Sequence, residues 1–290
     1  MRPPKPLLAL AALAVVLAAG TTGHLAASAS TASRGIYPYP TQASCVKTVR
    51  TEVRTRGKMT IATDSPAISP WFDSNNPGNG KGYESAVAYH VAAELGFRHD
   101  AVRWTSEPYE KGTAPGAKPF DFDINEVPWT RSLTSSVDLS IGYFNLNQSL
   151  VALHGSRIVA HHTPANLKGY LFGAQVASPG LAFLRNEVKP TRAPIAYPTL
   201  TAALAALLTH KVQAIMTDTP EGQSMAQLSG TVQFAQFHTT GSYYSLVSQK
   251  NSPLTACLDT AVHLLARSGE LARLGIAYLR VYNSVPFIRP

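Results

Sequence analysis

The order of strands and helices is the feature that most constrains this fold. The short apolar segment Met59–Ala62 is followed by Tyr83–Leu95, in which apolar residues recur at helical spacing. Two further apolar segments of strand length, Ala101–Trp104 and Phe120–Ile124, come next. Strand, helix and strand in this order predict an α/β unit with a largely parallel sheet and right-handed crossovers.

The same order begins again after Pro164. The expected strands of this second unit are Leu171–Gln175, Ile195–Tyr197, Val212–Met216 and Val232–Phe237, and its expected helices are Ser178 to about Glu187 and Thr199–Thr209. Two closing helices are expected at Leu254–Ala266 and Glu270–Tyr278. Two extended segments, Asn147–Leu153 and Gly241–Ser248, would carry the chain between the units. The sequence thus predicts two α/β lobes with a ligand cleft between them that closes by a hinge motion.

The first residues have the pattern of a secretory signal peptide. Arg2 and Lys5 precede the apolar run Leu7–Ala19, and small residues follow as far as Ala29. This run is shorter than the ~20 apolar residues that a membrane-spanning helix needs. We therefore expect residues 1–29 to be removed on export, and no lipoprotein cysteine follows the run. Residues 30–56 are expected to form an extended leader before the fold.

The chain has two cysteines, Cys45 and Cys257. In an oxidising compartment a pair without a third thiol predicts one disulfide, and two free buried thiols are the alternative. The formal net charge of +8 suits an anionic surface or an acidic ligand, although a merely solubilising surface explains it equally well.

Polar residues replace the apolar pattern directly after Phe120–Ile124. Glu126, Trp129, Thr130 and Arg131 follow there, and loops at the carboxyl ends of strands line the ligand crevice in open α/β sheets. The planar guanidinium of Arg131 suits a carboxylate or phosphate, with a solvated arginine as the alternative. Glu126 favours a cationic ligand or an ion pair with Arg131.

The stretch FDFDINEVPWTRSLTSSVDLSIGY, residues 120–143, resembles the bacterial extracellular solute-binding proteins of family 3, the polar amino-acid type that serves ABC importers. The positions that match without a gap are Phe120, Asp121, Asp123, Ile124, Asn125, Thr130, Val137, Asp138, Ser140 and Tyr143. Further blocks that are similar to the family follow in its order from about Gly57 to Leu279. The resemblance implies a two-lobed type II periplasmic-binding fold, each lobe a mostly parallel sheet flanked by helices, with two hinge crossings. Lobe 1 would comprise residues 57–148 and 246–290, and lobe 2 residues 149–245.

The resemblance also implies site residues. Asp64 and Asp218 correspond to acidic positions that face the ligand. Asp218 is the one that takes an α-ammonium, with turn capping ahead of Thr219-Pro220 as the alternative. Ser178 corresponds to a hydroxyl position at a helix N-terminus that receives a carboxylate, with a plain N-cap as the alternative. The arginine that grips the ligand's carboxylate in this family falls on Leu133, and a glycine falls on Glu126. This departure leaves open whether Arg131 replaces the missing arginine.

Trp71, after Ser69-Pro70, and Trp129, after Pro128, offer aromatic faces to an apolar or cationic part of a ligand. We expect an exported, monomeric protein that captures an amino acid or amino-acid-like solute for an ABC permease. A sensor, a partner-binding protein or a dehydratase-like enzyme with an altered pocket is the alternative. No catalytic order of Ser, His and Asp, no zinc motif and no nucleic-acid motif is present, so we expect no enzyme, cofactor, metal or nucleic-acid partner.

Overall fold

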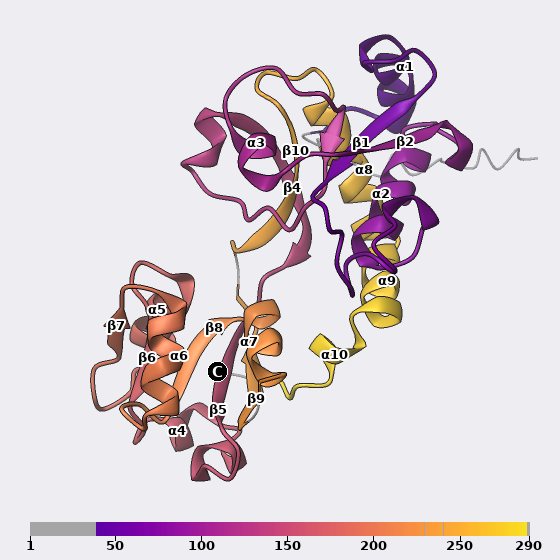
Figure 1. Ribbon diagram of the computed structural model, residues 1–290. Helices are drawn as coiled ribbons and strands as arrows, with labels where there is room; N and C mark the ends of the chain where they lie inside the picture. Colours follow the sequence, from indigo (N-terminus) through magenta and orange to yellow (C-terminus); the bar gives the residue numbers. More distant parts are fainter. Residues whose placement is uncertain (1–38, 229, 240, 289–290) are drawn as a thin grey trace, which may run out of the picture. The chain divides into compact units, whose positions relative to one another are not determined.

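The computed structural model describes residues 39–228, 230–239 and 241–288 (Figure 1). The predicted signal peptide lies outside these residues. They form two five-stranded sheets, each covered by helices, which we call lobe 1 and lobe 2. In the same ranges, no helix combines the length and the apolar composition that crossing a membrane requires.

Lobe 1 is built on a sheet with the strand order β2-β1-β3-β10-β4. β1 pairs in parallel with β2 and β3, whereas β10 pairs antiparallel with β3 and β4. The strands are β1 (Met59–Thr63), β2 (Val102–Ser106), β3 (Phe122–Asp123), β4 (Val137–Asn145) and β10 (Tyr243–Gln249). The helices are α1 (Gln42–Glu52), α2 (Tyr83–Glu94), α3 (Tyr109–Thr113), α8 (Thr255–Arg267) and α9 (Glu270–Tyr278).

Helix α2 lies in the middle of the lobe 1 core. Its residues Val87, Val91 and Ala88 are fully buried, and the helix contacts both α8 and α9. The helix begins after Gly82, which has a φ of 92°, and a Cβ there would lie 2.5 Å from the carbonyl oxygen of Trp71. Only glycine fits this close approach, so Gly82 fixes the direction in which α2 enters the core.

Lobe 2 is built on a sheet with the strand order β7-β6-β8-β5-β9. β6 pairs in parallel with β7 and β8, whereas β5 pairs antiparallel with β8 and β9. Both sheets are thus mixed, where the sequence predicted mostly parallel pairing. The strands are β5 (Gln148–Leu153), β6 (Phe172–Gln175), β7 (Ile195–Tyr197), β8 (Ala214–Asp218) and β9 (Thr231–Phe237). The helices are α4 (Pro164–Leu167), α5 (Pro179–Phe183), α6 (Leu200–Leu208) and α7 (Thr219–Ala226).

The C-terminal tail is a third connection between the lobes, besides the two predicted crossings. After α10 (Arg280–Asn283), the tail reaches β9, where the backbone N–H of Gln236 donates to Pro286 O at 2.9 Å and that of Ile288 donates to Gln236 O at 2.8 Å (Figure 1). Ile288 is buried in the lobe 2 core. The end of the chain therefore packs with lobe 2, and its prediction as part of lobe 1 is corrected.

The predicted pairing of the two cysteines is present: a disulfide joins Cys45 in α1 to Cys257 in α8, with a Cα–Cα distance of 5.2 Å. Residues 42–52 form helix α1, so the prediction of an extended leader is wrong for this segment. Thr41 caps the helix by accepting a hydrogen bond from the Ser44 N–H, and Cys45 and Val49, one turn apart, are buried. The disulfide and this narrow apolar face hold α1 on lobe 1.

Candidate functional site

Lobe 2 contains a cavity of about 140 Å³ where β6 and β8 end. β8 ends at Asp218, directly before α7, and β6 is followed by the turn that leads to Ser178 and α5. Because both strands point their carboxyl ends to this edge, residues distant in sequence meet there. The polar side chains that line the lobe 2 cavity belong to Gln148, Gln175, Ser178, Thr217, Asp218 and Glu221.

Asp218 and Gln148 form one wall of the lobe 2 cavity. The side-chain amide of Gln148 donates to Oδ1 of Asp218. Burial raises the pKa of Asp218 above its ordinary value, and this hydrogen bond partly offsets the effect. Gln148 is 0% exposed, and its Oε1 has no hydrogen-bond partner among the described residues. That oxygen faces α5, because a Cβ on Gly180 would lie 2.7 Å from it.

Glu221 stands in the first turn of α7 and lines the same cavity. Its Oε2 is buried and has no partner in the described part of the chain. Burial and the neighbouring charge of Asp218 raise the pKa of Glu221 to about 7. The cavity thus presents an acidic and an amide oxygen that no donor in the described ranges satisfies.

Ser178 caps α5: its Oγ accepts a hydrogen bond from the Leu181 N–H at 3.2 Å. Pro179 occupies the first helical position and has no N–H to offer. The N-cap alternative is therefore confirmed, and Ser178 also lines the cavity as the resemblance implied. Contact of its hydroxyl with a ligand stays a prediction.

Lobe 1 contributes a second pair of carboxyls, Glu84 and Glu126. Glu84 is 0% exposed, and its Oε1 accepts hydrogen bonds from the Glu126 N–H at 2.8 Å and from the Tyr143 hydroxyl. Burial raises the pKa of Glu84 to about 7. Glu126 has a φ of 50°, a left-handed backbone conformation that is uncommon for residues other than glycine. Burial and the charges of Glu84 and Glu221 raise the pKa of Glu126 to about 9.

Aromatic rings lie beside these carboxyls. Trp71 is 3% exposed, and its ring centroid lies 5.7 Å from that of Tyr244 and 5.8 Å from that of Tyr282. Burial raises the pKa of both tyrosines, and the charges of Glu126 and Glu221 add to the effect. Trp71 is thus part of the lobe 1 core behind two tyrosines that interact with the acidic residues. Direct contact of Trp71 with a ligand stays a prediction.

The remaining lobe 1 candidates lie on exposed or half-buried loops. Trp129 is 38% exposed, and its backbone N–H donates to Tyr243 O at 2.9 Å. Asp64 is half-buried, and its Oδ1 accepts a hydrogen bond from the Ser65 N–H at 2.6 Å. The Thr130 hydroxyl accepts a hydrogen bond from the Leu133 N–H at 3.3 Å. The structure tests a ligand role for none of these three residues.

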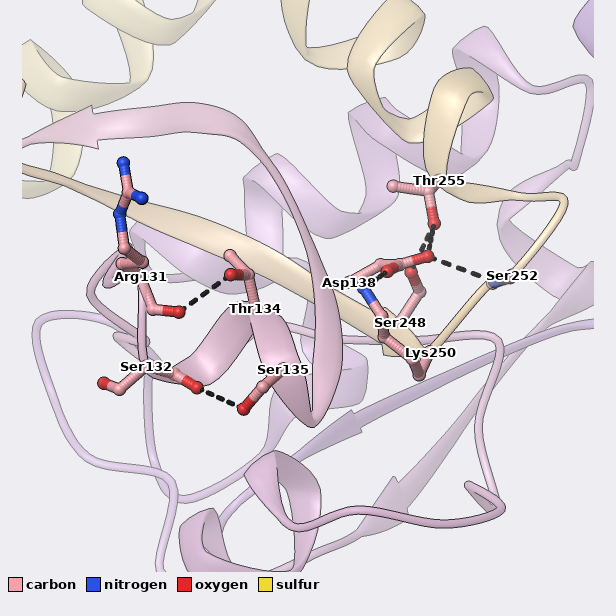
Figure 2. A network of polar contacts seen from close by, with 9 residues as sticks. All are labelled: Arg131, Ser132, Thr134, Ser135, Asp138, Ser248, Lys250, Ser252 and Thr255. Carbon is pink, nitrogen blue, oxygen red and sulfur yellow. Dashed lines mark hydrogen bonds and ion pairs between the residues drawn. The ribbon is translucent and has the colours of Figure 1, made fainter.

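Arg131 and Leu133 take different positions on the same loop. Arg131 is exposed, and Figure 2 shows its guanidinium extended away from Thr134, whose hydroxyl donates to the Arg131 carbonyl oxygen at 2.8 Å. No ion pair involves this guanidinium among the described residues. Leu133 packs against a small apolar cluster of Val127, Val137 and Val247. Leu133 therefore contributes to packing, whereas a ligand role for Arg131 stays a prediction.

Asp138, one of the residues matched to the family, has a structural role. Figure 2 shows its carboxylate accepting from Lys250 Nζ at 2.9 Å, from the Ser252 N–H at 3.1 Å and from the Thr255 hydroxyl at 3.1 Å. These bonds join β4 to the end of β10 and to the first turn of α8. The network fixes the sheet edge that carries the Arg131 loop.

Sequence reasoning missed Gln148, Glu221 and Glu84. Glu221 had a usable signal, because Thr219-Pro220 after a strand end is a typical helix start and places the next acidic residue in the first turn. Gln148 and Glu84 had none, since each reads as part of a regular strand or helix. Only their tertiary contacts, of Gln148 with Asp218 and of Glu84 with Glu126, distinguish them from other residues of a strand or helix.

Similar folds occur in solved structures of transporter components. One is the second substrate-binding domain of an amino-acid ABC transporter from Streptococcus pneumoniae Canada MDR_19A. It has a TM-score of 0.55 and 21% sequence identity, and the match covers 77% of this chain and 100% of that one. The L-cystine solute receptor of Neisseria gonorrhoeae in its unliganded open conformation has a TM-score of 0.55 and 19% identity, covering 81% and 95%. Substrate-binding domain 2 of Lactococcus lactis GlnP in an open conformation has a TM-score of 0.54 and 16% identity, covering 78% and 97%.

At these identities the likeness shows a shared fold. Comparison with curated protein sequences gave no match. The sequence profile of one family, however, extends over most of the chain and includes both lobes. Since that profile matches residues 59–280, the chain belongs to the bacterial extracellular solute-binding proteins, family 3.

Proposed function

We propose that this protein binds a small polar solute, an amino acid or an amino-acid-like molecule, and presents it to an ABC permease. The lobe 2 cavity carries this proposal, because Gln148 and Glu221 have buried oxygens there without partners among the described residues. Buried polar atoms in native proteins are nearly always satisfied, so such atoms in a cavity favour a polar occupant.

The proposed site has a part in each lobe. In lobe 2, Asp218 accepts a charge-assisted hydrogen bond from a ligand ammonium, and Ser178 lies beside it. In lobe 1 we assign Glu126 to the same site, because the charge of Glu221 adds to the effect of burial and of Glu84 in raising the pKa of Glu126. Asp64, Trp71, Trp129, Thr130 and Arg131 complete the set of candidate ligand residues.

The finer assignments of location and partners rest on the sequence and the family. The pattern of residues 1–29 supports export through a cleaved signal peptide, and the absence of a cysteine after its apolar run supports release without a lipid anchor. The family consists of extracellular proteins. On this support we propose a location outside the cytoplasm. A monomer that meets an ABC permease at the membrane stays a prediction.

A thermal-shift screen of the purified protein tests the function. The screen covers amino acids, amines, small sugars and organic acids. A ligand at a hundred times its Kd stabilises the folded state by ~2.7 kcal/mol, which raises Tm by a few degrees at this chain length. We expect one solute class to raise Tm in the wild type and not in Asp218→Asn.

Glu187→Gln serves as the matched control, because Glu187 is an exposed carboxyl in the same lobe. It should respond to the ligand as the wild type does. If no solute raises Tm, or if Asp218→Asn responds fully, the proposed function or its site is wrong.

A further inference from the structure

The unsatisfied polar atoms of the lobe 2 cavity are hydrogen-bond acceptors. Gln148 Oε1 and Glu221 Oε2 are buried without partners in the described chain, and Asp218 adds a carboxylate whose protein donor is the Gln148 amide. Gln148 supports a ligand site independently of the acidic residues, because its side chain is neutral. The side chain is 0% exposed, and its Oε1, which has no partner among the described residues, lies next to Gly180 in the cavity wall. Unsatisfied buried acceptors in a cavity favour an occupant that donates hydrogen bonds.

Lobe 1 has buried acidic groups of its own. The Oε2 of Glu84 is buried without a partner among the described residues, and Glu126 interacts electrostatically with both Glu84 and Glu221. Tyr244 lies within the electrostatic reach of all three of these carboxyls and of Asp218. Carboxylates beside the rings of Tyr244 and Tyr282 form an environment that favours positive charge.

Most backbone donors near these carboxyls are used or missing, although Asn125 Nδ2 is buried without a partner among the described residues and the Ser178 and Thr217 hydroxyls line the cavity. On the lobe 1 loop, the Glu126 N–H donates to Glu84, the Trp129 N–H donates to Tyr243 O, and Pro128 has no N–H. At the start of α5, the Leu181 N–H donates to Ser178 and Pro179 has no N–H.

Basic side chains do not replace these donors. None of the residues that line the lobe 2 cavity is basic. The charged neighbours that shift the pKa of Glu126 and Glu221 are all carboxyls, and Arg131 is not among them. A carboxylate placed here would meet negative charge without adequate compensation.

We propose that the ligand is an organic cation that lacks a carboxylate, namely an amine or a guanidinium compound. This inference rests on the proposed function and narrows its solute class. Its ammonium or guanidinium group donates to Asp218, Glu221 and the Gln148 oxygen. A metal ion fits less well, because no group of three or more His, Cys, Asp or Glu side chains in residues 39–228, 230–239 and 241–288 has the geometry to hold one.

Matched ligand pairs test this inference by isothermal titration calorimetry on the purified protein. Agmatine differs from L-arginine only by the missing carboxylate, and cadaverine differs from L-lysine in the same way. We expect the amine of at least one pair to bind roughly tenfold to a hundredfold more tightly than its amino acid. Equal or tighter binding of the amino acid in both pairs overturns the inference.

Two variants separate the site from the fold. Glu221→Gln keeps the shape of the side chain and removes its charge, so we expect it to weaken amine binding at least about tenfold with little change in Tm. Glu187→Gln, on the exposed surface of lobe 2, should leave the Kd unchanged. Unchanged amine affinity in Glu221→Gln argues against the assigned cavity.

The outcomes also distinguish this inference from the proposed function. If both pairs fail to bind and a solute that carries a carboxylate binds through Asp218, the protein is a solute-binding protein and the inference is wrong. If no solute of any class binds, both the inference and the proposed function are wrong.

Discussion

Glu84 in lobe 1 and Glu221 in lobe 2 are two buried carboxyls with the same pKa of about 7 and different surroundings. Glu84 accepts hydrogen bonds from the Glu126 N–H and the Tyr143 hydroxyl, so it holds a backbone loop in place. Each carboxyl has one oxygen without a partner among the described residues, but of the two only Glu221 lines the lobe 2 cavity. A raised pKa alone therefore does not identify a ligand residue; the partners of the carboxyl and the cavity that it lines do.

The largest expected effect is a loss of stability as the pH rises. The folded-state pKa values of Glu84 and Glu221, about 7, and of Glu126, about 9, lie above the ordinary value of 4.5. The folded state therefore binds more protons than the unfolded state between these values. The contribution of these carboxyls to the free energy of unfolding is fully present below about pH 4.5. It is lost as the pH rises through 7 towards 9, by roughly 3 kcal/mol for Glu84 alone.

Urea denaturation between pH 4.5 and 9 measures this fall. Glu84→Gln should remove about one carboxyl's share of the slope, and Glu187→Gln should leave the slope unchanged. A flat profile in the wild type would show that these carboxyls ionise normally in the folded protein. A saturating cationic ligand should reduce the contribution of Glu221 to this pH dependence and leave that of Glu84 unchanged, which would sharpen the contrast between the two carboxyls.

The second effect separates the two carboxyls by truncation. At pH 5, Glu84→Ala leaves the Glu126 N–H and the Tyr143 hydroxyl buried without their acceptor, so we expect a loss of about 2 kcal/mol. Glu221→Ala opens an existing cavity further and should cost less than about 1 kcal/mol. The shift of the urea midpoint at constant m-value measures both. Equal losses would refute the division between a structural and a ligand-binding carboxyl.

The sequence predicted the lobes well because strand and helix periodicities are local. The bounds of β7 at Ile195–Tyr197 and of α9 at Glu270–Tyr278 coincide with their predictions, and Ser178 is the N-cap that was expected as an alternative. Helix α1 was missed since its buried face consists of little more than Cys45 and Val49 and depends on docking against α8. A short face of this kind gives no clear periodic signal.

The site was predicted less completely because its acidic residues acquire their environment from distant segments. Asp218 was found at a strand end, a position that the sequence marks. Glu84 depends on a backbone N–H that is 42 residues away, and Gln148 on a carboxylate that is 70 residues away. No spacing rule connects such pairs, and the same holds for Ile288, whose burial depends on β9.

The third effect concerns the C-terminal tail and is confined to lobe 2. Ile288→Ala removes a buried side chain from the lobe 2 core, and we expect a loss of about 1 kcal/mol because the chain end can relax. Hydrogen exchange followed by mass spectrometry should show faster exchange in β9, which the tail covers through Gln236, and unchanged exchange in β1. Equal loss of protection in β1 would mean that the lobes unfold together.

The smallest expected effect is that of Arg131→Ala. The guanidinium is exposed, no ion pair in the described part of the chain uses it, and it does not shift the pKa of Glu126. Surface substitutions of this kind change the free energy of unfolding by less than about 0.5 kcal/mol.

If the ligand is a cation without a carboxylate, agmatine should bind Arg131→Ala and the wild type equally, whereas Glu126→Gln should bind it more weakly. If Arg131→Ala instead weakens L-arginine and leaves agmatine unchanged, Arg131 is the carboxylate receptor of lobe 1. The two lobes would then bind opposite poles of an amino acid, and the acidic character of the site would describe only its cationic end.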